Sequence, residues 1–159
     1  MDDSIASLLE QAGDGSISRA AAMAQAGQER TDVAAVRARM ARYLDVMRDS
    51  VRVGMNAERR SLSGLTGGQA ARLFDAAAQG KTAGGPLLAR AAARAMAVAE
   101  CNAGMGRIVA APTAGSCGIL PAALLTAQEE YHLTDDQLTD ALLTAAMFGQ
   151  IIARRASIS

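Results

Sequence analysis

LLARAAARAMAVAEC, residues Leu87–Cys101, is the stretch that decides the fold. Alanine fills seven of its 15 positions, and Met96 and Val98 are the apolar side chains larger than alanine between Arg94 and Glu100. Pro86 stands directly before it, a position that suits the first turn of a helix. A helix with so little side-chain volume lets neighbouring helices approach closely, or leaves its backbone near a ligand. The stretch therefore predicts closely packed helices.

The overall composition excludes several classes of protein. The 159 residues, about one domain, carry a formal net charge of zero, so bulk electrostatics gives no reason to expect nucleic-acid or membrane binding. No apolar run reaches the roughly 18 residues of a membrane span, and the acidic start MDDSIASLLEQ lacks the apolar core of a secretory signal. Two cysteines are too few for a disulfide framework. We therefore predict a reduced, cytoplasmic protein.

Glycines and apolar spacing place two helices before the alanine-rich stretch. Ser16–Gly27 is typical of a short helix ended by glycine, and Thr31 is the expected N-cap of a long helix. The long helix has apolar side chains at three- and four-residue steps: Val33, Val36, Met40, Leu44, Met47 and Val51.

Two pairs of residues have the spacing of a capping box. Thr66 and Gln69 predict a helix over 67–80, and Thr134 and Gln137 predict a last helix near the C-terminus. If the apolar stripe of that last helix is exposed, it favours self-association of the chain. The stripe consists of Leu138, Leu142, Ala145, Phe148 and Ile152.

Between these helices, Asn102–Gly118 breaks the helical pattern with several glycines and one proline. Arg107–Ala110 is the one candidate strand. The predicted fold class is thus all-α, a helical domain with a glycine-rich Pro-Thr-Ala-Gly-Ser-Cys-Gly loop between helices. Because the chain lacks βαβ alternation, and because its only lysine, Lys81, lies in a loop, pyridoxal phosphate chemistry is disfavoured.

Cys117 lies where the helix should resume. With Ser116 as the N-cap, Cys117 occupies the first helical position, where the helix dipole lowers the pKa of a thiol. A thiolate there serves as nucleophile or metal ligand, and Gly115 and Gly118 leave room for a bulky group. His132, the only histidine, follows a full helix later, which disfavours a cysteine–histidine pair. From the residues alone, Cys117 is equally a small buried residue at a helix start.

ECNAGMGRIVAAPTAGSCGILPAAL closely resembles the core segment of the iron-sulfur-dependent L-serine dehydratases (L-serine ammonia-lyases), in their α chain or catalytic domain. The likeness is most specific over Asn102–Pro121. SGLTGGQA, Ser63–Ala70, is similar to the family's upstream glycine-rich segment, and Tyr43–Met55 resembles the helix before it. The likeness as a whole runs from about Thr31 to the C-terminus.

The resemblance implies a lyase that removes ammonia from L-serine through an oxygen-sensitive 4Fe-4S cluster, giving pyruvate, a reaction of amino-acid degradation and gluconeogenesis. In the family, three cysteines bind three irons, and the open fourth iron acts as a Lewis acid on the substrate. Cys117 matches the first of these metal ligands. Asn102, Thr113, Gly115 and Ser116 match positions that bind the substrate or line its pocket. No residue of the sequence is identified as the catalytic base.

The resemblance also implies that 1–159, treated as a single helical domain, is the N-terminal portion of a larger catalytic domain. Family members continue with a glycine-rich segment that carries the remaining cluster cysteines, whereas this sequence stops at Ser159. Cys101 is expected to pack within its helix rather than to bind iron. The implied partners are the substrate L-serine, a β chain or regulatory domain, and a second copy of the chain.

With one cluster ligand of three, the 159-residue chain is expected to be inactive alone. The alternative function is that of a non-catalytic helical module, whose glycine-rich loop binds a small anion or a partner chain without any cluster. Iron and sulfide content after anaerobic reconstitution separates the two hypotheses.

Overall fold

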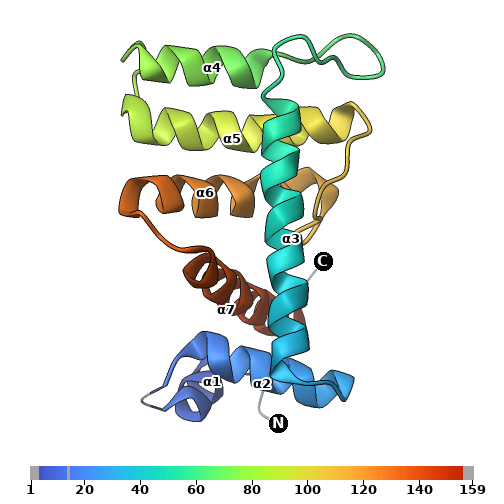
Figure 1. Ribbon diagram of the computed structural model, residues 1–159, viewed down its shortest axis with the longest axis vertical. Coiled ribbons are helices and arrows are strands. Elements are labelled where there is room, and N and C mark those ends of the chain that lie inside the picture. Colours follow the sequence, from blue (N-terminus) through green and yellow to red (C-terminus); the bar gives the residue numbers. More distant parts are fainter. Residues whose placement is uncertain (1–3, 14, 156–159) are drawn as a thin grey trace. The chain divides into compact units, whose positions relative to one another are not determined.

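A computed structural model confirms the all-α fold. It describes residues 4–13 and 15–155, and within them there are seven α-helices, one short 3-10 helix and no strand. The candidate strand Arg107–Ala110 has no regular structure. No helix of the described residues is long and apolar enough to cross a membrane. The α-helices are α1 (Ile5–Ala12), α2 (Ile17–Glu29), α3 (Val33–Gly54), α4 (Gln69–Ala78), α5 (Gly85–Ala103), α6 (Ile119–Tyr131) and α7 (Asp135–Arg155) (Figure 1).

The chain divides into two compact units. The first comprises residues 1–42 and 134–159, and the second comprises residues 43–133, so the boundary falls within α3. In the first unit, α2 packs on α7 and α1 packs on α2. Its core consists of four buried residues, with Val33 and Met40 packed against them: Ala22, Ala26, Val36 and Leu143.

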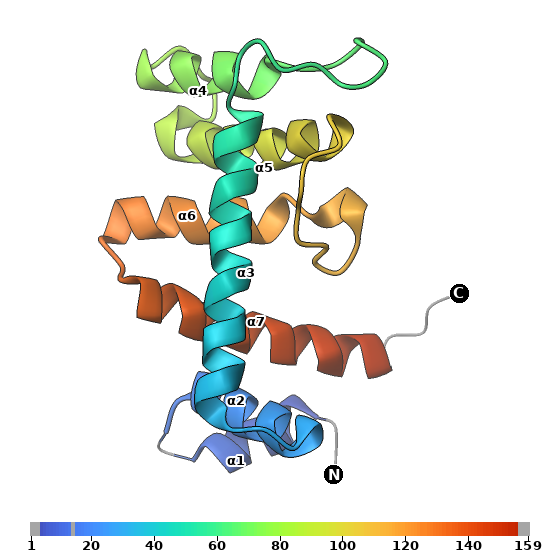
Figure 2. The same ribbon diagram turned by 45° about the vertical axis from the view of Figure 1, so that its right-hand side comes forward.

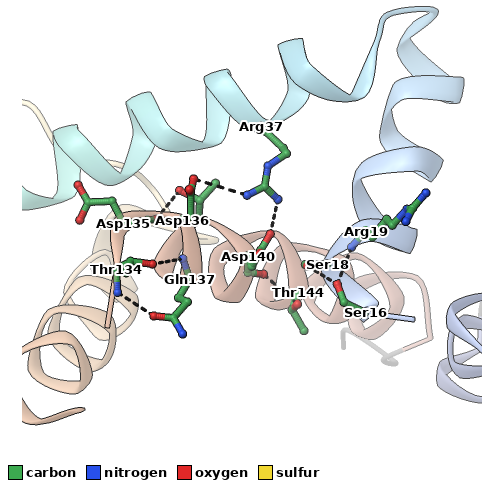
Figure 3. Close-up of polar contacts among 11 residues, drawn as sticks. Ser16, Ser18, Arg19, Arg37, Thr134, Asp135, Asp136, Gln137, Asp140 and Thr144 are labelled. Carbon is green, nitrogen blue, oxygen red and sulfur yellow. Dashed lines mark hydrogen bonds and ion pairs between the residues drawn. The ribbon is translucent and has the colours of Figure 1, made fainter. Parts of the chain in front are cut away.

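Arg37 ties the start of α3 to α7 in the first unit. Its guanidinium donates a hydrogen bond to Asp140 and lies 3.8 Å from an oxygen of Asp136 (Figure 3). The predicted capping box at the start of α7 is present: the Thr134 N–H donates to the Gln137 side chain at 2.8 Å, and the Gln137 N–H donates to Thr134 Oγ1 at 3.3 Å.

The second unit is built around the alanine-rich helix α5. Figures 1 and 2 both show α4, α5 and α6 as successive layers with α5 in the middle. Ala93 and Ala97 of α5 are fully buried, and Pro86 lies in the first turn, as the sequence predicts. The core of this unit joins Val51, Ala70, Ala97, Val98 and Cys117.

Two glycines allow other segments to touch the α5 backbone. A Cβ at Gly54 would lie 1.7 Å from the carbonyl oxygen of Ala97, and a Cβ at Gly118 would lie 2.5 Å from that of Ala95. Close backbone approach of this kind requires glycine, because any side chain would collide with main-chain atoms. The end of α3 and the start of α6 therefore both pack directly against the backbone of α5.

Some predicted helix boundaries and faces are wrong. The N-cap of α3 is Asp32, whose Oδ1 accepts the N–H of Ala35 at 2.6 Å, and not Thr31. Helix α1, capped by Ser4, was not predicted. In α7, Ile151 is 7% exposed and Ile152 is 58% exposed, because the buried face also includes Thr139 and Leu143 and is rotated from the predicted stripe. Leu138 and Leu142 of that stripe are buried, so it is not an exposed apolar surface.

Candidate functional site

The segment that carries the predicted site residues connects α5 to α6 in the second unit. It begins with a tight turn at the end of α5: the Gly104 N–H donates to the Glu100 carbonyl at 3.0 Å, and the Gly106 N–H donates to the Cys101 carbonyl at 2.7 Å. Between them Met105 adopts a left-handed conformation with φ 58°. A Cβ at Gly106 would lie 2.4 Å from Cys101 Sγ. The turn therefore needs a glycine at position 106, where the chain passes over Cys101.

Thr113 and Ser116 form a closed turn around the 3-10 helix Ala114–Ser116. Their side-chain oxygens are 3.0 Å apart, and each accepts the backbone N–H of the other residue. The Ser116 hydroxyl also lies 3.1 Å from the Ala111 carbonyl. Thr113 and Gly115 are exposed. These hydroxyl groups thus hold together a turn that is exposed to solvent at Thr113 and Gly115.

The structure corrects the prediction for the start of α6. The N-cap of α6 is Gly118 and its first residue is Ile119, so Ser116 is not the N-cap and Cys117 precedes the helix. Cys117 is 2% exposed and lies in the core of the second unit. Burial raises the pKa of the Cys117 thiol, and a hydrogen bond from its own backbone N–H opposes this only in part. The lowered pKa predicted from the helix start is therefore wrong, because the contact of Gly118 with α5 buries the neighbouring thiol.

Cys101 is also a buried thiol, in the last turns of α5. It is 1% exposed, and its Sγ lies 3.8 Å from the Arg107 carbonyl oxygen. Burial raises the pKa of Cys101, the nearby charge of Arg59 lowers it, and the neighbouring Cys117 raises it further. This buried environment is the one expected if the side chain of Cys101 serves to pack the helix.

The predicted site residues come together only in part. Thr113, Gly115 and Ser116 share one turn with Cys117 next to it. Asn102 is half-buried at the end of α5, and its side chain makes no hydrogen bond to that turn within the described residues. His132 is the C-cap at the other end of α6 from Cys117. This placement agrees with the expectation that the cysteine has no histidine partner.

The described residues do not form a complete metal site. No group of three or more His, Cys, Asp or Glu side chains that could hold a metal occurs among residues 4–13 and 15–155. Cys117 offers a single thiol, and its surroundings are apolar. A cluster held by three thiolates therefore does not fit the donors of this chain alone.

Glu100 was missed by the sequence analysis, although it holds the start of α4. Its carboxylate accepts three backbone N–H groups, from Gly68 at 2.7 Å, Gln69 at 2.9 Å and Ala70 at 3.1 Å. These are the N–H groups that a helix start leaves without partners. The predicted capping by Thr66 is therefore wrong. A signal was present, because Glu100 is the only acidic residue between Asp75 and Glu129.

Arg59 is the second residue that sequence reasoning missed. Its Nη2 donates to the Gly104 carbonyl at 2.8 Å, and its Nε is buried without a hydrogen-bond partner. A Cβ at Gly104 would lie 2.7 Å from that Nε. The Leu62 N–H also donates to the Ala103 carbonyl at 3.3 Å. The connection between α3 and α4 is thus fixed to the C-terminal end of α5, beside the predicted site.

The sequence of this chain is similar to those of several known proteins. Residues 12–159 match the family model of the serine dehydratase alpha chain. The probable L-serine dehydratase alpha chain of Bacillus subtilis is 42% identical over 116 residues, and the L-serine dehydratase alpha chain of Peptoniphilus asaccharolyticus is 36% identical over 124 residues. The alignments cover 73% and 78% of this chain, but 38% and 42% of those relatives, so the chain spans about two fifths of their length. No solved structure matches the chain.

Proposed function

Because the chain belongs to the serine dehydratase alpha chain family, we propose that the enzyme containing it converts L-serine to pyruvate and ammonia. The observation that carries this proposal is the family match over residues 12–159. In the proposed reaction, L-serine loses its C2 proton and its C3 hydroxyl. The resulting aminoacrylate tautomerises to an imine, which water hydrolyses to pyruvate and ammonia.

In this proposal, the turn between α5 and α6 lines the substrate pocket. Thr113 and Ser116 have their hydroxyls bonded to one another and to each other's backbone N–H groups, so they shape the turn backbone around Gly115. Exposed Gly115 allows a close approach to that backbone. Asn102, half-buried at the end of α5, offers an amide that can both donate to and accept from a polar substrate. None of these side chains is a base, so the base lies elsewhere in the enzyme.

The 4Fe-4S cluster remains part of the proposal, with Cys117 as one thiolate ligand and the other cysteines outside this chain. Cys117 is the one thiol next to the Thr113–Ser116 turn and it is buried, so the described residues of this chain do not hold the cluster by themselves. We propose that the 159-residue chain is inactive alone.

The further partners and the location follow from the same resemblance. Both relatives are named alpha chains, which implies enzymes with more than one kind of subunit. We therefore propose that this chain acts with a β chain or regulatory domain. A role in amino-acid degradation and gluconeogenesis in the cytoplasm is part of this proposal.

The test compares this chain with the same sequence extended to the length of its relatives. Both are reconstituted anaerobically with iron and sulfide, then assayed for pyruvate formation from L-serine. We expect activity in the extended protein and none in the 159-residue chain, with Cys117→Ala abolishing activity and lowering iron content. If the extended protein holds no iron and forms no pyruvate, the chain is a non-catalytic helical binding module within this family.

A further inference from the structure

The arginines of this chain differ in one respect that points to a ligand. Six of them are half-buried, and all but Arg59 form an ion pair with a carboxylate of the chain. Arg59 has no ion pair among the residues that the structure describes. A half-buried guanidinium is only partly hydrated, so a carboxylate beside it is bound more strongly than at a fully exposed arginine. The five paired arginines are Arg37, Arg39, Arg48, Arg90 and Arg94.

The position of Arg59 is fixed by the backbone of the predicted site. Its Nη2 donates to the Gly104 carbonyl at 2.8 Å, and its Nε faces the Cα of Gly104, where a Cβ would be only 2.7 Å away. A Cβ at Gly106 would lie 3.3 Å from Nη2. The two glycines therefore make room for the guanidinium plane beside the last turn of α5.

Capping of α5 uses only one of the five N–H donors of the Arg59 guanidinium. An arginine near a helix C-terminus stabilises the last carbonyls, and Arg59 makes one such bond, to Gly104. A guanidinium has five N–H donors, and Nε is buried without a partner. The N–H groups remaining on Nη1 and Nη2 form the edge that binds a carboxylate in a bidentate pair.

The charge of Arg59 also acts on Cys101, in the last turns of α5. It opposes the effect of burial on the pKa of Cys101, and Cys101 in turn is close enough to Cys117 to be affected by it. Arg59, Cys101 and Cys117 thus belong to one neighbourhood at the C-terminal end of α5. In both views the α3–α4 and α5–α6 connections lie at this end of α5 (Figures 1 and 2).

We propose that Arg59 binds the carboxylate of the amino-acid substrate, with Gly104 and Gly106 providing the space that holds its guanidinium in place. The inference rests on the proposed function, since it assigns a substrate contact within that site. Arg59 then determines specificity for substrates that have a carboxylate beside the amino group.

The test is steady-state kinetics and calorimetric binding of L-serine, both on the assembled enzyme that contains this chain. Arg59→Gln is expected to raise KM by about 10- to 100-fold with little change in kcat, because the contact is made equally before and during the reaction. Arg59→Lys, which keeps the charge but loses the planar fork, is expected to give an intermediate KM. Arg60→Gln is the matched control: Arg60 is exposed, lies in the same connection and donates only to nearby carbonyls.

Two inhibitors separate a carboxylate contact from a general loosening of the site. Glycine keeps the carboxylate of serine, and ethanolamine lacks it. In Arg59→Gln, inhibition by glycine should weaken by the same factor as KM rises, while inhibition by ethanolamine stays unchanged. Equal weakening of both, or an unchanged KM in a folded Arg59→Gln enzyme, overturns the proposal.

Binding distinguishes failure of the inference from failure of the proposed function. If the enzyme forms no pyruvate, the proposed function fails, whereas weaker serine binding in Arg59→Gln than in the unmodified enzyme still supports the contact. Serine binding that is equal in the two proteins, or undetectable in the unmodified enzyme, overturns the contact. Circular dichroism of each variant establishes that it is folded before either comparison is made.

Discussion

Gly54, the last residue of α3, lies against the backbone of Ala97 in α5. A Cβ at position 54 would be 1.7 Å from the Ala97 carbonyl oxygen and 2.8 Å from its Cα, which no small adjustment of a side chain relieves. Ala97 is fully buried at this contact. The alanine-rich composition of α5 therefore has a structural use, because it lets a second helix approach to backbone distance.

Gly54→Ala should destabilise the chain by about 2 to 4 kcal/mol, because the added methyl group forces the two backbones apart. The measurement is the free energy of unfolding in urea. Gly149→Ala is the control, since Gly149 is an exposed helical residue with open space around its Cα, and there alanine should stabilise by about 0.5 to 1 kcal/mol. Equal effects of the two substitutions would contradict the close approach.

Glu100→Gln should loosen the start of α4. The substitution replaces one carboxylate oxygen by an amino group that faces backbone N–H donors, so we expect a loss of about 2 to 3 kcal/mol in the free energy of unfolding. Hydrogen exchange should also become faster at the N–H groups of Gly68, Gln69 and Ala70. Glu58→Gln, on an exposed residue of the preceding connection, is the control and should change neither measurement.

The elements that the sequence predicts correctly are those whose determinants are local. The Thr134–Gln137 capping box forms because both partners lie within one turn and nothing else competes for their N–H groups. Thr66 and Gln69 have the same spacing and fail, because Glu100, distant in sequence, takes the N–H groups at the start of α4. The same limit applies to the N-cap of α3, where Asp32 and Thr31 are equally good caps by residue type.

The sequence correctly predicts which segment forms the irregular connection with the candidate site residues. It does not predict the pKa of Cys117 or the contact of Arg59 with Gly104. Glycine, proline and hydroxyl residues mark Asn102–Gly118 as an irregular connection, which the structure bears out over residues 104–118. The pKa of Cys117 depends instead on how far its side chain is buried when Gly118 packs against α5. The spacing of residues in the sequence does not show this burial. Arg59 lies 45 residues before Gly104, so no local pattern connects the two.

Both thiols should react slowly in the folded chain. Burial raises the pKa of Cys117 and of Cys101 above the ordinary 9.0, so at neutral pH both are protonated as well as shielded. We expect a charged aromatic disulfide reagent to modify them at least about 10-fold more slowly in buffer than in urea. Cys101→Ser and Cys117→Ser assign the two rates. Rapid modification of Cys117 in the folded chain would mean that its sulfur is exposed as a thiolate.

The raised pKa values of the two thiols also determine how the free energy of unfolding changes at alkaline pH. The unfolded thiols ionise near their ordinary pKa of 9.0, before the folded ones do, so the folded state binds more protons above that pH. The stabilising contribution is complete below about pH 9 and declines as the pH rises further. The Cys101→Ser, Cys117→Ser double variant should show a shallower decline in the free energy of unfolding between about pH 8 and pH 10. A parallel decline in both proteins would contradict the raised pKa values.

Glu129 should make a contribution to the free energy of unfolding that is lost at acid pH, whereas the contribution of the thiols is lost at alkaline pH. The hydrogen bond from Arg94 lowers the pKa of this carboxyl, against a smaller effect of burial. Arg94 also lies over the Phe74 ring, 5.8 Å from its centre, and donates to Thr126 Oγ1 at 2.7 Å. The folded pKa lies below the unfolded one, so the contribution is present above about pH 4.5 and is lost as the pH falls through the folded value. Because the side chain is 45% exposed, solvent screening keeps the effect small.

Acid unfolding of a Glu129→Gln variant tests this contribution. The variant should be less stable than the unmodified chain at about pH 6, and the difference should shrink as the pH falls to about 3, where the unmodified carboxyl is protonated as well. Glu10→Gln, on an exposed residue of α1, controls for the loss of one negative charge. A difference that stayed constant from pH 6 to about pH 3 would assign the role of Glu129 to packing of its side chain rather than to its charge.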